Sequence, residues 1–479
     1  MGTMGTEGAK VQIAAMKVSH HFFYVLATLL FVIAPARVSF AAPVLMISID
    51  GMKPEYVTQA DTRGLRLPFL RSLVRDGVYA DGVTGVWPTV TYPSHTTLLT
   101  GVSPAEHGIY NNLVFDPQRT FSGAWNWYAQ QIQVPTLWQA AHNAGLRTAS
   151  VGWPVSVGST DVDWLIPEYW RISPAQSLNP SDRELMAALS RPDAMLDQMQ
   201  RELGPYMIGN DTSRNGDEIK TRYALDILRK QKPAFMTIHL SSLDETEHEH
   251  GPFSTEANQE LEAIDAMVSR LADAARANDP STVVLVVSDH GFAPITHELN
   301  IFIPFVQAGL IQTTVNQETK AVTIASWKAQ PWLAGGMAAI MIHHGEDADD
   351  RQTEQQVHVL LQKLAADANN GIAAILDRDE VKKRGGFPDA AFLVVLKSGY
   401  YTGGSLTGNL VNVIPGTRGS HGFSPEFPEM RASFFLAGPG IAHHRDLGLI
   451  DMRQIAPTVA ELLNVPMPTA KATALNVKP

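Results

Sequence analysis

Two continuous apolar runs, each followed closely by an aspartate, constrain the fold of this chain most strongly. Val44–Ile49 (VLMISI) leads into Asp50-Gly51, and Thr282–Ser288 (TVVLVVS) leads into Asp289-His290-Gly291. Uninterrupted apolar runs of this length are typical of strands in a parallel sheet that is covered on both faces. Ligands of α/β proteins bind at the carboxyl ends of such strands. The sequence therefore predicts a buried sheet with acidic side chains at its ligand-binding edge.

The same pattern continues along most of the chain. Further strands are expected at Thr148–Gly152, Ala234–Leu240 and Ser433–Ala437. Amphipathic helices are expected between the strands, at Leu67–Asp76, Val134–Ala144, Ser213–Lys230, Glu256–Asn278 and Asp451–Leu463. Strands that alternate with helices predict a doubly wound α/β fold, with a mostly parallel central sheet and helices on both faces.

Two segments interrupt this alternation, and we interpret them as insertions at the rim of the sheet. The first covers about residues 160–210 and is rich in Pro, Trp and Tyr. The second covers about residues 300–401 and contains a helix expected near Glu354–Asn370. It also contains a small sheet, expected from Val322–Trp327, Met337–His343 and Phe392–Leu396. With 45% hydrophobic residues, the chain can bury one large catalytic domain, expected over residues 43–479.

Residues 1–42 are typical of a signal peptide. The apolar stretch Phe22–Ala36 follows Lys17 and leads to the small residues Ala41-Ala42, as at a cleavage site. An uncleaved anchor is the alternative, although the stretch is short for a membrane span. We expect an exported protein, periplasmic or secreted, that is free of the membrane after cleavage.

Composition excludes several kinds of site. The chain contains no Cys, which excludes disulfides, thiolate metal ligands and a cysteine nucleophile. Its net charge of -11 disfavours a nucleic-acid polymer as partner, because no basic stripe is available to neutralise phosphates.

Further carboxylate and imidazole side chains occur in patterns that suit metal ions. Asp244 and His248 are four residues apart, which places both on one face of a helical turn. His421 lies in the glycine-rich loop Gly419–Gly422 (GSHG). Taken singly, such residues are equally consistent with a turn or a solvated loop. Together with the acidic groups after the two apolar runs they predict a two-metal site, with zinc favoured and manganese possible.

Thr91 is the candidate nucleophile beside this site. It lies in the segment WPTVTYPSH, ahead of a helix expected at His95–Leu99. Free N–H groups at a helix N-terminus suit a phosphoryl oxygen, and Asn112 could donate its amide to the same oxygens. A threonine hydroxyl attacks only when its pKa is lowered, for example by a metal. The alternative is that Thr91 caps the helix and Asn112 occupies a turn.

These motifs resemble the nucleotide pyrophosphatase/phosphodiesterase family of the alkaline phosphatase superfamily. The resemblance is densest over Pro88–Asn112 and includes SIDG, DETEHEHGP, SDHG and GSHG, in the order of the family. It implies an alkaline phosphatase-like fold and two zinc ions per chain. One zinc would be held by Asp50, Thr91, Asp289 and His290, and the other by Asp244, His248 and His421. It also implies that Asn112 and the Thr91 backbone N–H bind a phosphoryl oxygen, and that Tyr92 lines the substrate slot. Trp153 would lie in a loop beside the leaving-group pocket, and Tyr169 and Trp170 near the position where the family stacks a nucleobase.

The expected function is hydrolysis of phosphodiester or pyrophosphate bonds through a covalent phospho-threonine. Val90, Tyr92 and Pro93 around the nucleophile are uncharged, which favours a diester over a dianionic monoester. A small-molecule substrate of nucleotide type is expected. Phosphonoacetate hydrolase or phosphomonoesterase activity, and a non-catalytic metal-binding role, remain the alternatives; the absence of Cys disfavours a sulfatase.

Overall fold

The computed structural model describes residues 41–118, 124–171, 180–344 and 350–479. The predicted signal peptide, residues 1–42, lies outside these ranges except for its last two residues. Within the described ranges, the search for a helix with the length and apolar character of a membrane span finds none.

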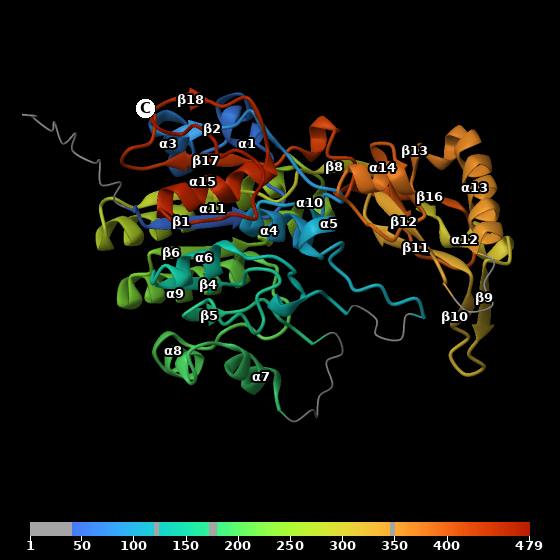
Figure 1. Ribbon diagram of the computed structural model, residues 1–479, viewed down its shortest axis with the longest axis horizontal. Helices are drawn as coiled ribbons and strands as arrows, with labels where there is room; N and C mark the ends of the chain where they lie inside the picture. The colour runs from blue at the N-terminus through green and yellow to red at the C-terminus, as the bar shows by residue number, and fades with distance from the viewer. Residues whose placement is uncertain (1–40, 119–123, 172–179, 345–349) are drawn as a thin grey trace, which may run out of the picture. The chain divides into compact units, whose positions relative to one another are not determined.

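The central sheet has eight strands in the order β18-β2-β17-β7-β1-β6-β4-β5 (Figure 1). β1 (Val44–Ile49) pairs in parallel with β6 (Phe235–Leu240) and β7 (Val283–Val287), and β4 (Thr148–Val151) pairs in parallel with β6. The strand expected at Ser433–Ala437 is present as β17 (Phe434–Ala437), but it runs antiparallel to β7. A continuous apolar run indicates that both faces of a strand are buried, but not the direction of the strand. The sequence therefore could not distinguish a parallel from an antiparallel strand.

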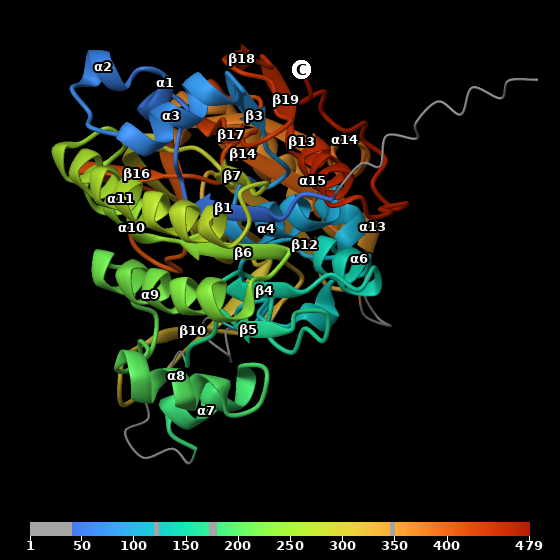
Figure 2. The same cartoon turned by 90° about the vertical axis from the view of Figure 1, so that its left-hand side faces the viewer.

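Helices cover both faces of this sheet, which confirms the doubly wound fold (Figure 2). Alternate residues of β1 point to opposite faces: Leu45 and Ile47 join one core, and Val44 and Met46 join the other. The first core includes α3 (Pro68–Asp76), α9 (Arg214–Gln231) and α11 (Thr255–Asn278). The second includes α4 (Thr91–Thr100), α6 (Leu137–Asn143) and α15 (Ile455–Leu463).

The first expected insertion is shorter than its predicted range. β5 (Trp164–Ile166) pairs in parallel with β4 and forms the edge of the central sheet, so the segment from residue 160 belongs to the core fold. The helices α7 (Asp182–Leu189) and α8 (Met195–Leu203) follow it beyond that edge (Figure 2). Ser181 and Glu184 form a capping box that starts α7.

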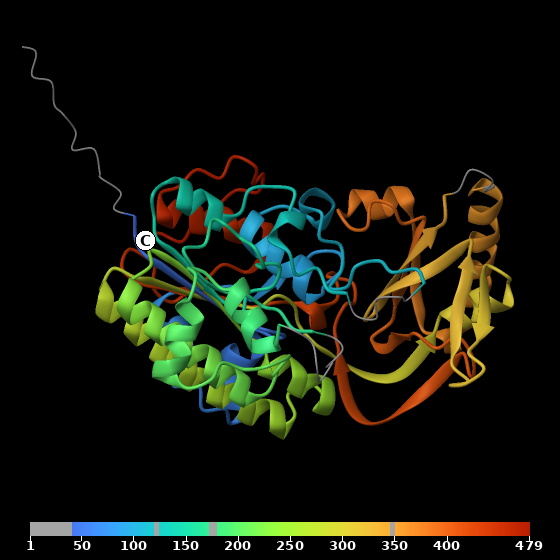
Figure 3. The ribbon, with the colours of Figure 1, turned by 90° about the horizontal axis from the view of Figure 1, so that it is seen from below.

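The second insertion builds a lobe with its own apolar core on one side of the central sheet (Figures 1 and 3). Its four-stranded sheet has the order β11 (Ala329–Ala334), β12 (Met337–Ile342), β14 (Phe392–Leu396) and β13 (Ile372–Asp377). Val322–Trp327 was expected in this sheet, but as β10 it pairs only with β9 (Ile311–Val315) in a separate hairpin. The expected helix is α13 (Asp350–Ala366), followed by a short 3₁₀ turn at Ala368–Asn370.

Three strands connect this lobe to the central sheet. β8 (Ala293–Asn300) leaves the core fold directly after β7, and β16 (Val411–Ser420) returns to it. β8 lies between β16, with which it is antiparallel, and β15 (Gly399–Gly403), with which it is parallel.

Candidate active site

The carboxyl ends of β1 and β7 hold the first group of candidate ligands. Because these strands are parallel neighbours, the residues that follow them lie side by side. Asp50, Asp289 and His290 are all buried there. His290 Nε2 lies 3.3 Å from Asp50 Oδ1 and 3.1 Å from Asp289 Oδ2. The structure thus brings together the three residues that the sequence placed after two separate apolar runs.

The second group combines two residues of α10 (Ser242–His250), the helix that follows β6, with His421. Asp244 and His248 share one face of this helix, and His248 Nε2 is 3.5 Å from Asp244 Oδ2. His421 Nε2 approaches the other carboxylate oxygen, Asp244 Oδ1, to 3.7 Å. In each of the two groups, one ligand atom from every residue lies within 4.8 Å of the others.

The pairing of β8 with β16 brings His421 to this place. Ala293 near the start of β8 is opposite Ser420 at the end of β16. The chain that leaves the core fold just after His290 therefore returns to it just before His421. The result is that the two imidazole rings stack, with their centroids 3.8 Å apart.

The three histidines of the two groups share one orientation. The Nδ1 of each lies within hydrogen-bond distance of a backbone carbonyl, which can only accept. For His248, His290 and His421 these carbonyls belong to Gly419, Gly291 and Thr89, at 3.1, 3.2 and 3.1 Å. Each Nδ1 therefore carries the proton, and each Nε2 presents a lone pair towards the carboxylates. Backbone contacts of this kind fix metal-binding histidines.

Several buried atoms of the site lack a partner within the described part of the chain. They are Asp50 Oδ1, Asp244 Oδ1, Asp289 Oδ2 and His290 Nε2. A buried polar atom without a hydrogen bond costs about 1–3 kcal/mol, and here lone pairs face one another. A divalent cation in each group would satisfy these atoms. The oxygen and imidazole donors fit zinc, or manganese.

Burial raises the pKa of two carboxyl groups at this site and lowers the pKa of the His421 imidazole. Desolvation, with repulsion from neighbouring carboxylates, raises the pKa of Asp50 and of Asp289 well above the usual value. Desolvation also lowers the pKa of His421 to about 3, with a further contribution from His248. The His421 imidazole is thus already neutral, as a metal ligand must be, and a bound cation would favour the ionised carboxylates.

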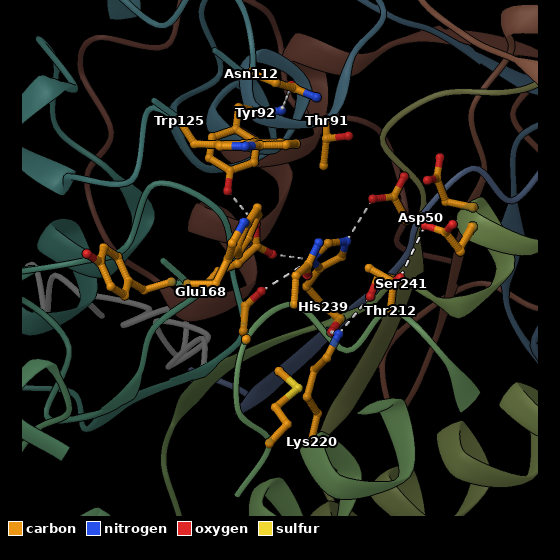
Figure 4. A pocket seen from close by; sticks show the side chains of 18 of the residues that line it. Asp50, Thr91, Tyr92, Asn112, Trp125, Glu168, Thr212, Lys220, His239 and Ser241 are labelled. Atoms are coloured by element: carbon orange, nitrogen blue, oxygen red, sulfur yellow. Dashed lines mark hydrogen bonds and ion pairs between the residues drawn. The ribbon is translucent and has the colours of Figure 1, made fainter. Parts of the chain in front are cut away.

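Thr91 is the first residue of α4, so this helix begins four residues earlier than the sequence suggested. Its side chain is 9% exposed and lines the cavity shared with Asp50 and Asp244. Asn112 lies beside it, where its Oδ1 accepts a 2.8 Å hydrogen bond from the Tyr92 backbone N–H. That bond orients the Asn112 amide, so its NH₂ group could donate to a substrate oxygen (Figure 4).

His95 supports Thr91 and was not singled out by the sequence analysis. Its Nδ1 lies 2.8 Å from the Thr91 carbonyl oxygen, and its Nε2 lies 2.9 Å from Ser48 Oγ. The ring is fully buried, and desolvation lowers its pKa well below the usual range. The four-residue spacing from Thr91 on a helix is the sequence signal that could have identified it.

Aromatic side chains form one wall of the cavity (Figure 4). Tyr92 and Trp125 have ring centroids 5.1 Å apart, and Trp125 and Trp170 have centroids 4.9 Å apart. Tyr169 also lines the cavity. The structure therefore places the predicted residues Tyr92, Tyr169 and Trp170 at the cavity, and adds Trp125, which no local pattern indicated.

Trp153 is a correction to the sequence analysis. It was expected to bind substrate from a loop beside the leaving-group pocket, but its indole is fully buried beneath the site. There it packs edge-on against His95, at 4.9 Å between centroids, and against Trp138. The neighbouring Gly152 reaches the cavity in its place. The direction of the Trp153 side chain depends on the core beneath it, which the local sequence does not specify.

Three charged or titratable residues at the cavity were also missed: Glu168, Lys220 and His239. His239 interrupts the apolar strand β6, and a polar residue in such a strand is a usable signal. Glu168 and Lys220 had no comparable signal, because they reach the site from β5 and α9 only through the order of the strands.

A profile of the type I phosphodiesterase / nucleotide pyrophosphatase family matches residues 44–424. The chain belongs to this family. All seven of the residues proposed as metal ligands or nucleophile fall within the matched range.

Individual members of the type I phosphodiesterase / nucleotide pyrophosphatase family are distant in sequence. Ectonucleotide pyrophosphatase/phosphodiesterase family member 1 of Rattus norvegicus is 26% identical over 259 residues, which are 52% of this chain and 24% of the rat protein. Venom phosphodiesterase of Naja atra is 24% identical over 267 residues, 53% of this chain and 27% of the venom protein. The chain thus spans about a quarter of the length of these curated relatives.

Solved structures of the family share the fold. Murine ectonucleotide pyrophosphatase/phosphodiesterase 5, in an inactive threonine-to-alanine form in complex with AMP, aligns with a TM-score of 0.60 and 16% identity. The alignment covers 89% of this chain and 96% of the murine one. The human protein of the same name aligns with a TM-score of 0.60 and 18% identity, covering 91% and 96% of the two chains.

Proposed function

We propose that this protein hydrolyses phosphodiester or pyrophosphate bonds at a two-metal site, with Thr91 as the nucleophile. The observation that carries the proposal is the pair of ligand groups, which hold oxygen and nitrogen atoms without a partner among the described residues. Asp50 of the first group and all three residues of the second line one cavity with Thr91. Membership of the type I phosphodiesterase / nucleotide pyrophosphatase family supports the reaction class.

In this proposal Asp50, Asp289, His290 and Thr91 hold one cation, and Asp244, His248 and His421 hold the other. Zinc is favoured, and manganese is the alternative. Bound divalent cations would supply Lewis-acid stabilisation of the charge that develops on the attacking, leaving and phosphoryl oxygens.

The residues of the chain would then act in two steps. Thr91 Oγ1 gives up its proton to solvent and attacks phosphorus, forming the phospho-threonine ester while the bond to the leaving oxygen breaks. Water then hydrolyses that ester and restores the Thr91 hydroxyl, so that configuration at phosphorus is retained overall. Asn112 donates its amide N–H to a non-bridging oxygen, and His95 holds the Thr91 backbone in place.

A diester fits the cavity better than a dianionic monoester. Among the described residues that line the cavity, the only Lys or Arg is Lys220. Its Nζ is paired with Asp217 Oδ1 at 2.9 Å, and its side chain is 4% exposed. The described lining residues therefore offer no free cation to receive the extra charge of a monoester or the carboxylate of phosphonoacetate, which disfavours these two alternatives.

We favour nucleotide-type substrates, because the partly exposed rings of Trp125, Tyr169 and Trp170 offer faces on which a base can stack. The murine structural relative in complex with AMP supports this choice. We also propose export after cleavage near Ala42, which N-terminal sequencing of the mature protein tests.

The decisive experiment measures hydrolysis of an aryl nucleotide diester, with and without chelator, together with metal content per chain. We expect two metals per chain and chelator-sensitive turnover. Thr91→Ala should abolish turnover while both metals remain, and the surface variant Thr62→Ala should behave as wild type. Full turnover by Thr91→Ala would refute the nucleophile. A metal-loaded wild-type protein that turns over no diester would instead support the non-catalytic alternative.

A further inference from the structure

A chain of hydrogen-bonding side chains connects the substrate wall to the first metal group. Glu168 Oε1 accepts a 2.5 Å hydrogen bond from the Tyr92 hydroxyl, and Glu168 Oε2 lies 3.0 Å from His239 Nδ1. The other ring nitrogen, His239 Nε2, lies 2.9 Å from Asp50 Oδ2. Each carboxylate oxygen of Glu168 is therefore engaged, and its side chain is only 15% exposed (Figure 4).

The contact with His239 decides which oxygen of Asp50 is left for a cation. Asp50 Oδ2 faces His239, whereas Asp50 Oδ1 has no partner within the described residues and faces His290. If the His239 ring rotated, Asp50 could turn about its terminal bond and lose this direction. Among the described residues, Glu168 and, at 3.2 Å, the Gly152 carbonyl oxygen are the partners of His239 Nδ1.

We propose that Glu168 and His239 are positioning residues for the metal group at Asp50, with Glu168 as the anchor of the chain. This inference rests on the proposed two-metal function. Glu168 holds the His239 ring, His239 holds Asp50 Oδ2, and Asp50 Oδ1 is thereby directed at the position shared with Asp289 and His290. Through Tyr92, the same carboxylate is tied to the helix that begins with Thr91.

The position of Lys220 supports a structural role for Glu168 within the chain. Lys220 Nζ donates to the His239 carbonyl oxygen and to Ser241 Oγ, and it pairs with Asp217. It thus binds the main chain at the end of β6 and has no contact with Glu168 among the interactions described. Among the described residues, the hydrogen-bond partners of Glu168 are Tyr92 and His239.

Glu245 provides a matched control. It is a second carboxylate that lines the same cavity, but it is exposed, and its Oε2 accepts a hydrogen bond only from Thr212 in the described structure. Glu245→Gln removes the same charge from the cavity as Glu168→Gln without touching the chain from Tyr92 to Asp50.

The test is a chelator competition on purified protein loaded with zinc, with metal content per chain as the readout. Partners that orient metal ligands are worth about 10–100-fold in metal affinity. We expect Glu168→Gln and His239→Gln each to lower the affinity for one of the two zinc ions by about this factor. Glu245→Gln should change the affinity for neither ion. Because the two residues act in series, the double variant should lose no more zinc affinity than the single variant that binds zinc less tightly.

Further measurements separate the possible outcomes. Equal zinc affinity in Glu168→Gln and wild type overturns the proposal, as does a raised KM for diesters with unchanged zinc affinity, which would make Glu168 a substrate contact. Should Glu168→Gln fail to fold, His239→Gln still tests the proposal. Tight binding of both zinc ions by His239→Gln would contradict the proposed chain of contacts from Glu168 through His239 to Asp50. A wild-type protein that binds neither zinc nor manganese would refute the proposed function itself.

Discussion

The imidazole rings of His290 and His421 lie parallel, 3.8 Å apart between centroids and with an interplanar angle of 11°. One ring belongs to the group with Asp50 and Asp289, and the other to the group with Asp244 and His248. The stack therefore sets the two proposed metal positions side by side. Two-metal hydrolysis of phosphate esters requires such proximity, because both cations act on the same phosphoryl group.

Removing His421 should empty one metal position and leave the other. His421→Ala is expected to lower zinc content from two to one per chain and to reduce diester hydrolysis at least 100-fold. Atomic absorption on dialysed protein measures the content. The control is His344→Ala, an exposed histidine paired with Asp350, which should keep both metals. Two tightly bound metals in His421→Ala would exclude His421 as a ligand.

Gly422 is expected to be intolerant of a side chain. Its φ is +82°, and a Cβ there would lie 2.1 Å from the Ala334 carbonyl oxygen. Gly422→Ala should lower the free energy of unfolding by about 2–4 kcal/mol, the sum of backbone strain and overpacking, and should weaken metal binding through His421. Gly64→Ala isolates the strain, because Gly64 has φ +69° and open space around it. Equal losses in urea denaturation of the two variants would show that the close contact is unimportant.

The aromatic wall should contribute to substrate affinity and not to the chemical step. Trp125→Ala and Trp170→Ala are each expected to raise KM for an aryl nucleotide diester about 5–10-fold, which corresponds to about 1–1.4 kcal/mol. The value of kcat should change little. Steady-state kinetics measure both parameters, with Trp327→Ala in the inserted lobe as control. A fall in kcat alone would contradict a stacking role.

His107 should make stability depend on pH. The ring is fully buried, and desolvation lowers its pKa to about 3. The Ile109 backbone N–H donates to its Nδ1, so the neutral ring is the form that fits. Below about pH 6.5 the unfolded chain binds a proton that the folded ring does not, so the free energy of unfolding falls by up to about 1.4 kcal/mol per pH unit.

The non-ionisable variant His107→Gln isolates this effect. Its stability relative to wild type should improve by about 2 kcal/mol between pH 6.5 and pH 5. Urea denaturation of both proteins in chelator, at each pH, measures the difference. If the difference between the two proteins stays constant with pH, His107 does not titrate as we expect.

Local patterns were sufficient for much of the fold and for the candidate ligands. The apolar runs before Asp50 and Asp289 are strands because they bury both faces, and the four-residue spacing of Asp244 and His248 is one helical turn. These features depend on a few consecutive residues. Errors arose where direction or pairing mattered, as for the antiparallel β17 and the separate hairpin β9–β10.

The sequence by itself identified the residues that we propose to bind metal and to attack phosphorus, since burial, helical spacing and turn chemistry are encoded within short segments. Only the tertiary structure decided that His421 stacks on His290, that Trp153 turns into the core, and that Glu168 reaches His239. The physical reason is that strand order and register, which arise from packing of the whole domain, fix the distances between segments far apart in the chain.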